Sequence, residues 1–346
     1  MTTARLAVVG AGAWGTALAV QAVRAGFAPR LWVFEAELLE ILRRSLENAW
    51  FLPEVRLPEA IEADGDLAAV VGGAETVVVA VPSHVFRSVV RAMAAHLAPG
   101  ARVLSAAKGI EEVRLARMSE VLAEELPRSH ARRTAVLSGP TFAQEVGHGR
   151  PTAAVLASAD AGLARELQAA LATPTFRLYT QSDVAGVELG GALKNVLAIA
   201  TGIADGLELG YNARAALLTR GLAEITRLGV ALGARARTFA GLAGLGDLIL
   251  TCTGELSRNR RLGLALARGE SLAEWQAGTR SVAEGVRTAQ AGLALARRAG
   301  VATPVIAEVA AVLFERKAPR EALLALLSRS ARPEEEPYDL AGADDA

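Results

Sequence analysis

Cysteine, histidine, lysine and aromatic residues are all scarce in this chain of 346 residues. The single cysteine, Cys252, excludes an internal disulfide framework and any cysteine-rich metal site, and nothing around it favours a reactive thiolate. The four histidines lack the spacing of zinc ligands, so we expect no metal site. Aromatic residues make up 4% of the chain, whereas 52% is hydrophobic, so the core must consist mainly of Ala, Val and Leu. This apolar composition excludes a disordered chain.

Net charge is absent as well, because 37 basic residues balance 37 acidic ones. No global field therefore draws the chain to nucleic acid or to an anionic membrane. The longest apolar stretch, over 184–204, contains Glu188, Lys194 and Asn195, which are costly in hydrocarbon. We expect it to be a buried helix and not a membrane span. The N-terminus lacks a basic leader and runs into an expected strand, which indicates a cytoplasmic protein.

Strand and helix signals alternate in the first half of the chain but not in the second. Apolar runs predict strands over 4–9, 30–34, 76–81, 101–106, 134–138 and 152–157. The alternation predicts an α/β fold with a doubly wound, mostly parallel sheet. From about residue 184, Ala- and Leu-rich segments predict a second, all-helical domain, with helices over 184–204, 213–232, 258–268, 281–299 and 303–316.

A dinucleotide fingerprint lies near the start of the chain. Gly10, Gly12 and Gly15 have the G-x-G-x-x-G spacing, follow an expected strand and open an expected helix. Gly10 permits a tight turn, Gly12 lets a pyrophosphate approach the backbone, and Gly15 lets the helix pack on the strand. Glu35 closes the next strand 20 residues after Gly15. The alternative is a glycine-rich turn that binds nothing.

Glu35 also bears on which dinucleotide binds. Its carboxylate can accept hydrogen bonds from an adenosine ribose and would repel the 2′-phosphate of NADP. The neighbouring Phe34 offers no positive charge to that phosphate. We therefore predict NAD as the preferred cofactor, with NADP as the second possibility.

These observations divide the chain into three parts. Residues 1–183 are expected to form an NAD-binding Rossmann-like domain, and residues 184–332 a helical substrate-binding domain. Residues 333–346 contain prolines and several acidic residues, and we expect an acidic, flexible tail.

Only three of the 37 basic residues are lysines, and two of them fall in candidate sites. Lys194 follows Gly190 and Gly191 in an apolar helix, where a lysine shielded from water has a lowered pKa and exchanges a proton near neutrality. Arginine stays protonated and cannot do this. Lys108 follows an expected strand, at the sheet edge where ligands bind. The alternatives are a lysine that extends to water and a solvated loop residue; Lys317 is expected at the surface.

Two candidate sites precede and follow this helix. In SGPTFA, Gly139 and Pro140 force a turn that exposes the Thr141 hydroxyl, unless the segment is a plain turn. Asp247 is a carboxylate in a glycine-rich, apolar stretch. Its unpaired burial would be costly, so we expect a cation or a ligand beside it.

A third candidate site opens the next helix at Ser257, Arg258 and Asn259. Arginine side chains and the N–H groups at a helix start together suit a phosphate or a carboxylate. The alternative is an N-cap serine followed by a solvated basic face.

Several of these segments together resemble one known family. The segments GAGAWGTALA, VPSHVFR, AAKGIE, SGPTFAQE, GVELGGALKNVLAIATGIADG, GLAGLGDLILTCTGELSRNRRLG and VAEG occur in this order. Residues 4–330 resemble the soluble bacterial type of NAD(P)-dependent sn-glycerol-3-phosphate dehydrogenase. The resemblance implies a Rossmann-like domain followed by a helical substrate domain, and a homodimer. It also implies reversible reduction of dihydroxyacetone phosphate by NAD(P)H, which supplies glycerophospholipid synthesis.

The resemblance implies roles for single positions. Lys194 matches the residue that donates and accepts the proton. The positions that match substrate-binding residues are Lys108, Gly139, Thr141, Lys194, Asp247, Ser257, Arg258 and Asn259. Together with the fingerprint, it gives the expected cofactor-binding positions, which are Gly10, Gly12, Ala13, Trp14, Gly15, Phe34, Glu35, Lys108, Ala143, Arg258, Val282 and Glu284. Two departures are Ala13, where many bacterial members have Ser, and Phe34, where they often have Arg or His.

Two other functions stay open. Related β-hydroxyacid dehydrogenases, which act on a carboxylate substrate, typically carry Asn four residues after the lysine; this chain has Ala198 there and Asn195 beside the lysine instead. A module that senses NAD without turnover would need only the fingerprint. It would leave Lys194 and the SRNRR segment without a purpose.

Overall fold

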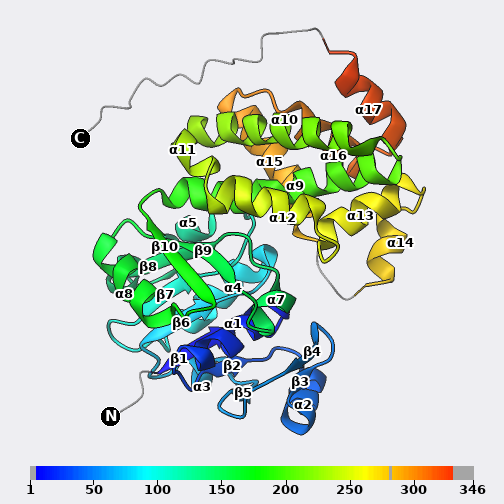
Figure 1. The fold of residues 1–346 in the computed structure, drawn as a ribbon. Coiled ribbons are helices and arrows are strands. Elements are labelled where there is room, and N and C mark those ends of the chain that lie inside the picture. The colour runs from blue at the N-terminus through cyan, green and yellow to red at the C-terminus, as the bar shows by residue number, and fades with distance from the viewer. Residues whose placement is uncertain (1–4, 280–282, 330–346) are drawn as a thin grey trace.

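The computed structural model describes residues 5–279 and 283–329 as a sheet-based half joined to a helical half (Figure 1). Eight strands form one sheet in the order β10-β9-β8-β7-β6-β1-β2-β5, and every neighbouring pair except β8 and β9 is parallel. The strands are β1 Leu6–Val9, β2 Arg30–Trp32, β5 Glu62–Asp64, β6 Thr76–Val79, β7 Arg102–Ser105, β8 Thr134–Ser138, β9 Thr152–Ala157 and β10 Phe176–Gln181. The predicted α/β fold with a mostly parallel sheet is confirmed.

Helices cover both faces of the sheet, which explains the continuous apolar runs of its strands. In β1, Leu6 and Val8 face a core shared with α1, α2 and α8, whereas Ala7 and Val9 face a second core shared with α3, α4 and α5. The helices of this half are α1 Ala13–Arg24, α2 Ala36–Ser45, α3 Leu67–Val71, α4 Ser83–Ala94, α5 Met118–Glu125, α6 Arg128–Ala131, α7 Ala143–Gly147 and α8 Ala161–Leu171.

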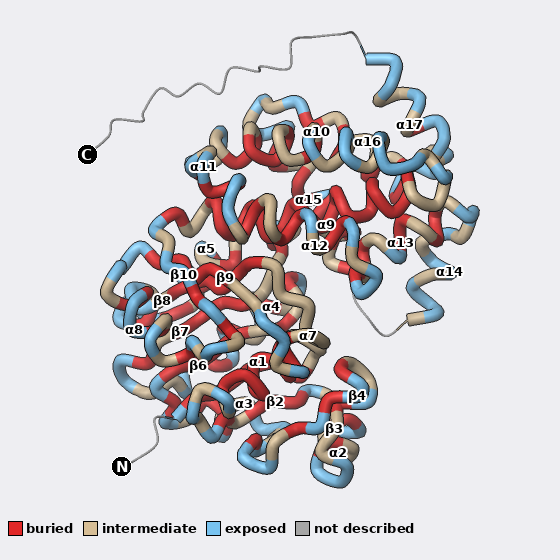
Figure 2. The backbone as a smooth tube through the Cα atoms, in the orientation of Figure 1, coloured by how far each residue is buried: buried red, intermediate tan, exposed pale blue. Residues whose placement is uncertain are grey.

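The second half is helical, as predicted, and packs around α9 (Val184–Gly206). Figure 2 shows α9 buried along most of its length among its neighbours. This helix is long and apolar enough to cross a membrane, but the whole of its apolar window is buried inside the fold, so the expected buried helix is confirmed. Its partners are α10 Gly210–Ala231, α11 Ala236–Phe239, the π-helix η1 Leu242–Gly246, α12 Asp247–Thr253, α13 Arg258–Ala267, α14 Leu272–Ala277, α15 Glu284–Ala299, α16 Pro304–Phe314 and α17 Pro319–Leu327.

Some elements were not predicted from the sequence. The edge strands β5 and β10 are polar or alternate between buried and exposed residues, so they lack an apolar run. A small antiparallel hairpin, β3 Glu47–Asn48 and β4 Leu52–Arg56, also lies in a segment without a strand signal. The sheet ends at Gln181 and α9 begins at Val184, and we propose the division between 183 and 184 on that basis. The expected tail over 333–346 lies outside the described residues.

Candidate active site

The carboxylate of Asp247 lies between the two lysines that the sequence singled out. Lys194 Nζ donates hydrogen bonds to Asp247 Oδ1 at 2.6 Å and to Thr251 Oγ1 at 2.5 Å. Lys108 Nζ donates to Asp247 Oδ2 at 2.8 Å, to the Gly139 carbonyl at 2.8 Å and to Thr141 Oγ1 at 3.2 Å. Residues from the ends of β7 and β8, from α9 and from α12 therefore meet at one point.

This cluster is shielded from water. Lys194 is 5% exposed and Asp247 is 1% exposed, so the alternative of a lysine that extends to water does not hold. Burial lowers the pKa of Lys194 to about 8, because it penalises the charged ammonium. The Asp247 carboxylate opposes this shift, and the positive charge of Lys108 adds to it. An amine with this pKa can give up and take back a proton near neutral pH.

Glycines allow the surrounding backbone to come this close. A Cβ on Gly191 would lie 2.4 Å from Ser138 Oγ at the end of β8, and a Cβ on Gly190 would lie 2.9 Å from the Ala243 carbonyl in η1. The π-helix η1 runs directly into α12, whose first residue is Asp247. Such π-helical turns are frequent at functional sites. Here the turn sets Asp247 against Lys194.

The start of α13 forms a second group of polar side chains. Ser257 caps the helix, since its Oγ accepts a hydrogen bond from the Arg260 N–H at 3.2 Å. The Asn259 amide nitrogen donates to Asn195 Oδ1 at 2.9 Å, and its Oδ1 accepts from the Gly285 N–H at 2.9 Å. Asn259 thereby ties α13 to α9 and α15.

Arg258 differs from its neighbours in this group. It is partly buried, and burial lowers the pKa of its guanidinium. Within residues 5–279 and 283–329, this guanidinium has no hydrogen bond and no ion pair within 4 Å, although the charge of the Glu284 carboxylate raises its pKa somewhat. A cation in this position suits an anionic ligand.

The fingerprint glycines have the geometry that a dinucleotide needs. Gly10 has a φ of +113°, and a Cβ on Gly15 would lie 1.9 Å from the Gly10 carbonyl. No side chain caps α1 at Gly12, and a Cβ there would have no heavy atom within 4 Å. A pyrophosphate could therefore approach the backbone at Gly12, and the start of α1 offers it N–H groups, so these residues fit a bound dinucleotide. Ala13 begins α1, and the Trp14 indole N–H donates to the Ala106 carbonyl at 3.1 Å.

The expected ribose contacts follow β2. Phe34 is 77% exposed, and Glu35 is the residue before α2, where its side chain caps no N–H group. Arg30, the nearest cation in the sequence, is engaged with Glu62 at 3.2 Å at the other end of the strand.

The remaining positions at which we expected cofactor contacts are spread over both halves. Ala143 begins α7. Glu284, at the start of α15, accepts hydrogen bonds from the Ser83 N–H at 3.2 Å and from the Ser83 hydroxyl at 2.7 Å, which joins α15 to the start of α4. Val282 lies outside the described residues.

Sequence reasoning missed two residues of this site. Thr251 follows Asp247 by four residues, one helical turn, and that spacing is a signal that could have revealed it. Ser83 lies in VPSHVFR, directly after β6, but received no role. Both positions depend on the fold, because their partners are 57 and 201 residues away.

Comparisons with known proteins decide the family. The sequence model of the NAD-dependent glycerol-3-phosphate dehydrogenase N-terminus matches residues 5–164, and that of the C-terminus matches residues 183–324. The chain belongs to the NAD-dependent glycerol-3-phosphate dehydrogenase family. It is therefore an NAD(P)-dependent oxidoreductase, as the resemblance implied. Family membership does not favour the alternatives of a β-hydroxyacid dehydrogenase or an NAD-sensing module.

Individual members of the glycerol-3-phosphate dehydrogenase family resemble nearly the whole chain. The glycerol-3-phosphate dehydrogenase (NAD(P)+) of Syntrophotalea carbinolica is 52% identical over 329 residues, which cover 95% of this chain and 99% of that protein. The enzyme of the same name from Geobacter sulfurreducens is 49% identical over 330 residues, covering 95% and 98%. The crystal structure of glycerol-3-phosphate dehydrogenase from Coxiella burnetii superposes with a TM-score of 0.90 at 40% identity, covering 94% and 99%.

Proposed function

We propose that this enzyme interconverts dihydroxyacetone phosphate and sn-glycerol 3-phosphate, with Lys194 as the general acid and base. The observation that carries the proposal is the buried Lys194 amine on the Asp247 carboxylate, with a pKa lowered to about 8. When bound, the nicotinamide supplies or accepts the hydride. Lys194 donates a proton to the substrate oxygen during reduction and removes it during oxidation.

Other residues of the cluster prepare the substrate. The Lys108 ammonium polarises the carbonyl oxygen as a fixed positive charge in a site of low water content. Asp247 holds both ammonium groups in place through its two oxygens. Gly139 and Thr141, which accept hydrogen bonds from Lys108, complete this side of the proposed substrate site.

The substrate phosphate binds at the start of α13. The Arg258 guanidinium, which has no hydrogen bond or ion pair among the described residues, and the N-terminal end of this ten-residue helix both favour an anion. Ser257 and Asn259 flank Arg258 in the proposed phosphate site. Holding the phosphate there fixes the ketone relative to Lys194, and such orientation accounts for a large share of enzymatic rate enhancement.

The dinucleotide binds at the fingerprint, with NAD preferred over NADP. Gly10, Gly12, Ala13, Trp14 and Gly15 receive the pyrophosphate at the start of α1. Phe34 and Glu35 receive the ribose, where the carboxylate repels a 2′-phosphate. The further proposed contacts are Lys108, Ala143, Arg258, Val282 and Glu284. We also propose a homodimer and a supply role in phospholipid synthesis on the basis of the family resemblance, and a cytoplasmic location on the basis of the N-terminal sequence.

The experiment is a turnover assay with dihydroxyacetone phosphate and NADH, on the wild type, Lys194→Met and Lys317→Met. We expect kcat to fall by ~10²–10⁴ in Lys194→Met, since a general acid is lost. Lys317, which pairs with Glu308 at 2.6 Å, is the matched control and should leave kcat unchanged. In the wild type, reduction should slow as the pH rises through about 8, because the deprotonated amine has no proton to give.

Three results would overturn parts of this proposal. A wild type that does not turn over this substrate removes the function, and a Lys194→Met variant with normal kcat removes the role of Lys194. A kcat/KM with NADPH equal to or above that with NADH removes the cofactor preference.

A further inference from the structure

The loop over residues 106–117, which carries Lys108, joins the two halves of the molecule. Several of its side chains contact the helical half. Lys108 binds Asp247, Ile110 is 1% exposed within the core around α9, and Glu112 pairs with Arg287 of α15 at 2.5 Å. These contacts attach the loop to the helical half, and its attachment to the sheet-based half depends on other residues.

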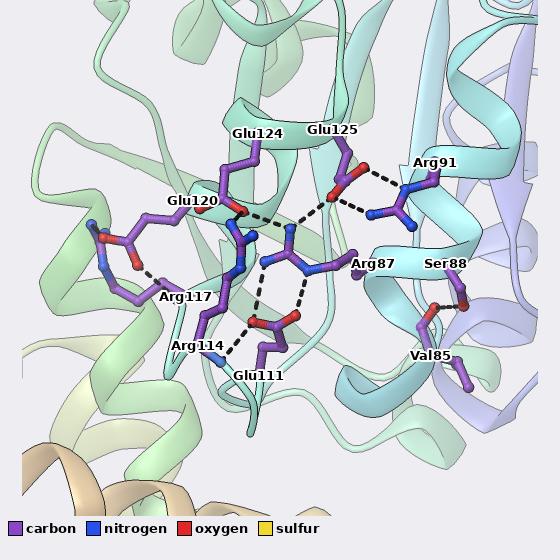
Figure 3. Close-up of polar contacts among 10 residues, drawn as sticks. All are labelled: Val85, Arg87, Ser88, Arg91, Glu111, Arg114, Arg117, Glu120, Glu124 and Glu125. Atoms are coloured by element: carbon purple, nitrogen blue, oxygen red, sulfur yellow. Dashed lines mark hydrogen bonds and ion pairs between the residues drawn. The ribbon is translucent and has the colours of Figure 1, made fainter.

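Glu111, between Ile110 and Glu112, makes such a contact with α4. Its two carboxylate oxygens accept hydrogen bonds from Nε and Nη2 of Arg87, the second at 3.1 Å (Figure 3). The side chains of Arg87 and Glu111 are only 17% and 11% exposed. Arginine binds a carboxylate in this two-pronged way with a defined orientation, which a single contact does not provide. The pair thus ties the loop firmly to α4.

Glu111 also fixes the shape of the loop itself. Its Oε2 accepts a hydrogen bond from the Arg114 N–H at 3.3 Å, and its own N–H donates to the Ala116 carbonyl at 2.9 Å. The hydrogen bond from Arg87 holds the pKa of Glu111 below its usual range, so the carboxylate is charged at neutral pH. The Glu111 side chain therefore fixes both the turn within the loop and the attachment of the loop to α4.

The surroundings of Arg87 keep this pair in place. Its Nη1 also binds Glu124 at 2.6 Å and Glu125 at 2.7 Å, both on α5. Arg91 lies at the margin of this cluster, where it pairs with Glu125 at 2.8 Å and makes no contact with Glu111 (Figure 3). Because Arg87 has carboxylates on several sides, it cannot turn away from Glu111 without breaking other ion pairs.

We propose that Arg87 and Glu111 are positioning residues, whose ion pair holds the loop so that the Lys108 ammonium stays on Asp247. Neither residue belongs to the site described above. The inference rests on the proposed function of Lys108, and it adds a support for that lysine on the side of α4.

The test compares Glu111→Gln with Lys108→Met and with Arg91→Gln as the matched control. Arg91 belongs to the same ion-pair cluster, but its side chain is 68% exposed and bonds Glu125, not Glu111. We expect Glu111→Gln to lower kcat/KM by ~10–100-fold, because a small displacement of a catalytic group has an effect of this size. Arg91→Gln should keep the wild-type value.

The pH profile separates positioning from simple loss of charge. The groups that set the Lys194 pKa are its own burial, Asp247, Lys108 and Cys252, with Lys108 lowering it. If the loop moves and Lys108 leaves Asp247, the apparent pKa of Lys194 rises. If Glu111→Gln only removes a negative charge from the region, that pKa falls. We expect a rise in Glu111→Gln and in Lys108→Met.

Combining the substitutions completes the experiment. If Glu111 acts through Lys108, adding Glu111→Gln to Lys108→Met changes kcat/KM no further. Arg87→Lys keeps the charge but loses the two-pronged contact, so it should lower kcat/KM and raise the apparent pKa of Lys194 to a smaller extent. This variant replaces Glu111→Gln in the test if Glu111→Gln does not fold. Normal kinetics in Glu111→Gln, a falling or unchanged pKa, or fully additive effects would overturn the inference. A fully active Lys108→Met would instead overturn the proposed role of Lys108.

Discussion

A single carboxylate, Asp247, organises the chemistry at the residue scale. Its two oxygens each accept a hydrogen bond from a different lysine, and without it two ammonium groups would face each other in a buried site. Arginine serves for positive charge nearly everywhere else in the chain. Lysine occupies these two positions instead. Unlike arginine, a lysine side chain can lose its proton when buried, and its positive charge is compact.

Arg258 gives a prediction at this scale. Replacing it with Gln removes the cation proposed to bind the phosphate, so the KM for dihydroxyacetone phosphate should rise by roughly 10- to 150-fold, which corresponds to ~1.5–3 kcal/mol for a hydrogen bond to a charged group. Steady-state kinetics at saturating NADH measure this. Arg261, which is exposed on the same helix, is the control, and Arg261→Gln should leave KM unchanged. An unaltered KM in Arg258→Gln would remove Arg258 from the phosphate site.

At the scale of elements, the contact between α9 and α13 decides where the phosphate lies relative to Lys194. A Cβ on Gly263 would lie 2.2 Å from the Ile199 carbonyl, and one on Gly202 would lie 2.1 Å from the Arg260 carbonyl. Two glycines thus let the helix backbones touch. The helix that begins with Arg258 is thereby pressed against the helix that carries Lys194.

Substituting Gly263 with Ala tests this packing. The added methyl group meets backbone that cannot move aside, so the protein should lose ~1–3 kcal/mol of stability, with a lower Tm in thermal unfolding. Gly246→Ala is the control, because that residue has helical angles and its Cβ would make only ordinary contacts at 3.7 Å. Its Tm should stay equal or rise slightly. Equal Tm values for the wild type and Gly263→Ala would contradict the close contact.

The sequence predicted those elements whose own residues carry the signal. The strand β6 is a run of four buried residues, and α9 is a long and predominantly apolar segment, so both were expected. The three-residue strand β5 is polar and obtains its strand form only by pairing with β2. The antiparallel direction of β9 likewise depends on the chain path, which local sequence does not encode.

The candidate site likewise contains residues that the sequence reveals and contacts that only the fold creates. Lys108, Lys194 and Asp247 were found because a rare residue type or a buried charge stands out in a sequence. Their shared hydrogen bonds were not foreseen, since Asp247 is 139 residues from Lys108. The ion pair of Arg87 with Glu111 spans 24 residues and two elements, and each residue alone has the pattern of a surface charge.

For the whole molecule, Glu224 links stability to pH. This side chain of α10 is 1% exposed and accepts hydrogen bonds from the Val305 and Ile306 N–H groups at the start of α16, each at 2.9 Å. Burial raises its pKa to about 7. The folded chain therefore holds this proton in a range where the unfolded chain has already released it.

It follows that folding stability should fall as the pH rises from about 4.5 to about 7, by up to about 3 kcal/mol from this residue. Glu224→Gln cannot ionise and should lose less stability over that window, as measured by urea unfolding at a series of pH values. Glu255→Gln at an exposed position should keep the wild-type slope. Carboxyls such as Glu125, whose pKa is lowered to about 2, make the folding stability rise with pH instead, but they do so below pH 4.5. Identical slopes for Glu224→Gln and the wild type would contradict the assignment.

The scarcity of lysine has a practical consequence for chemical labelling. Apart from the N-terminal amine, an acylating reagent has three targets in the whole chain, and two of them lie on Asp247. Lys317, paired with Glu308, is the remaining one. A bulky fluorophore ester applied below pH 8 should therefore mark mainly the N-terminal amine, and to a lesser extent Lys317. Inactivation by a small acylating reagent would report modification of Lys108 or Lys194.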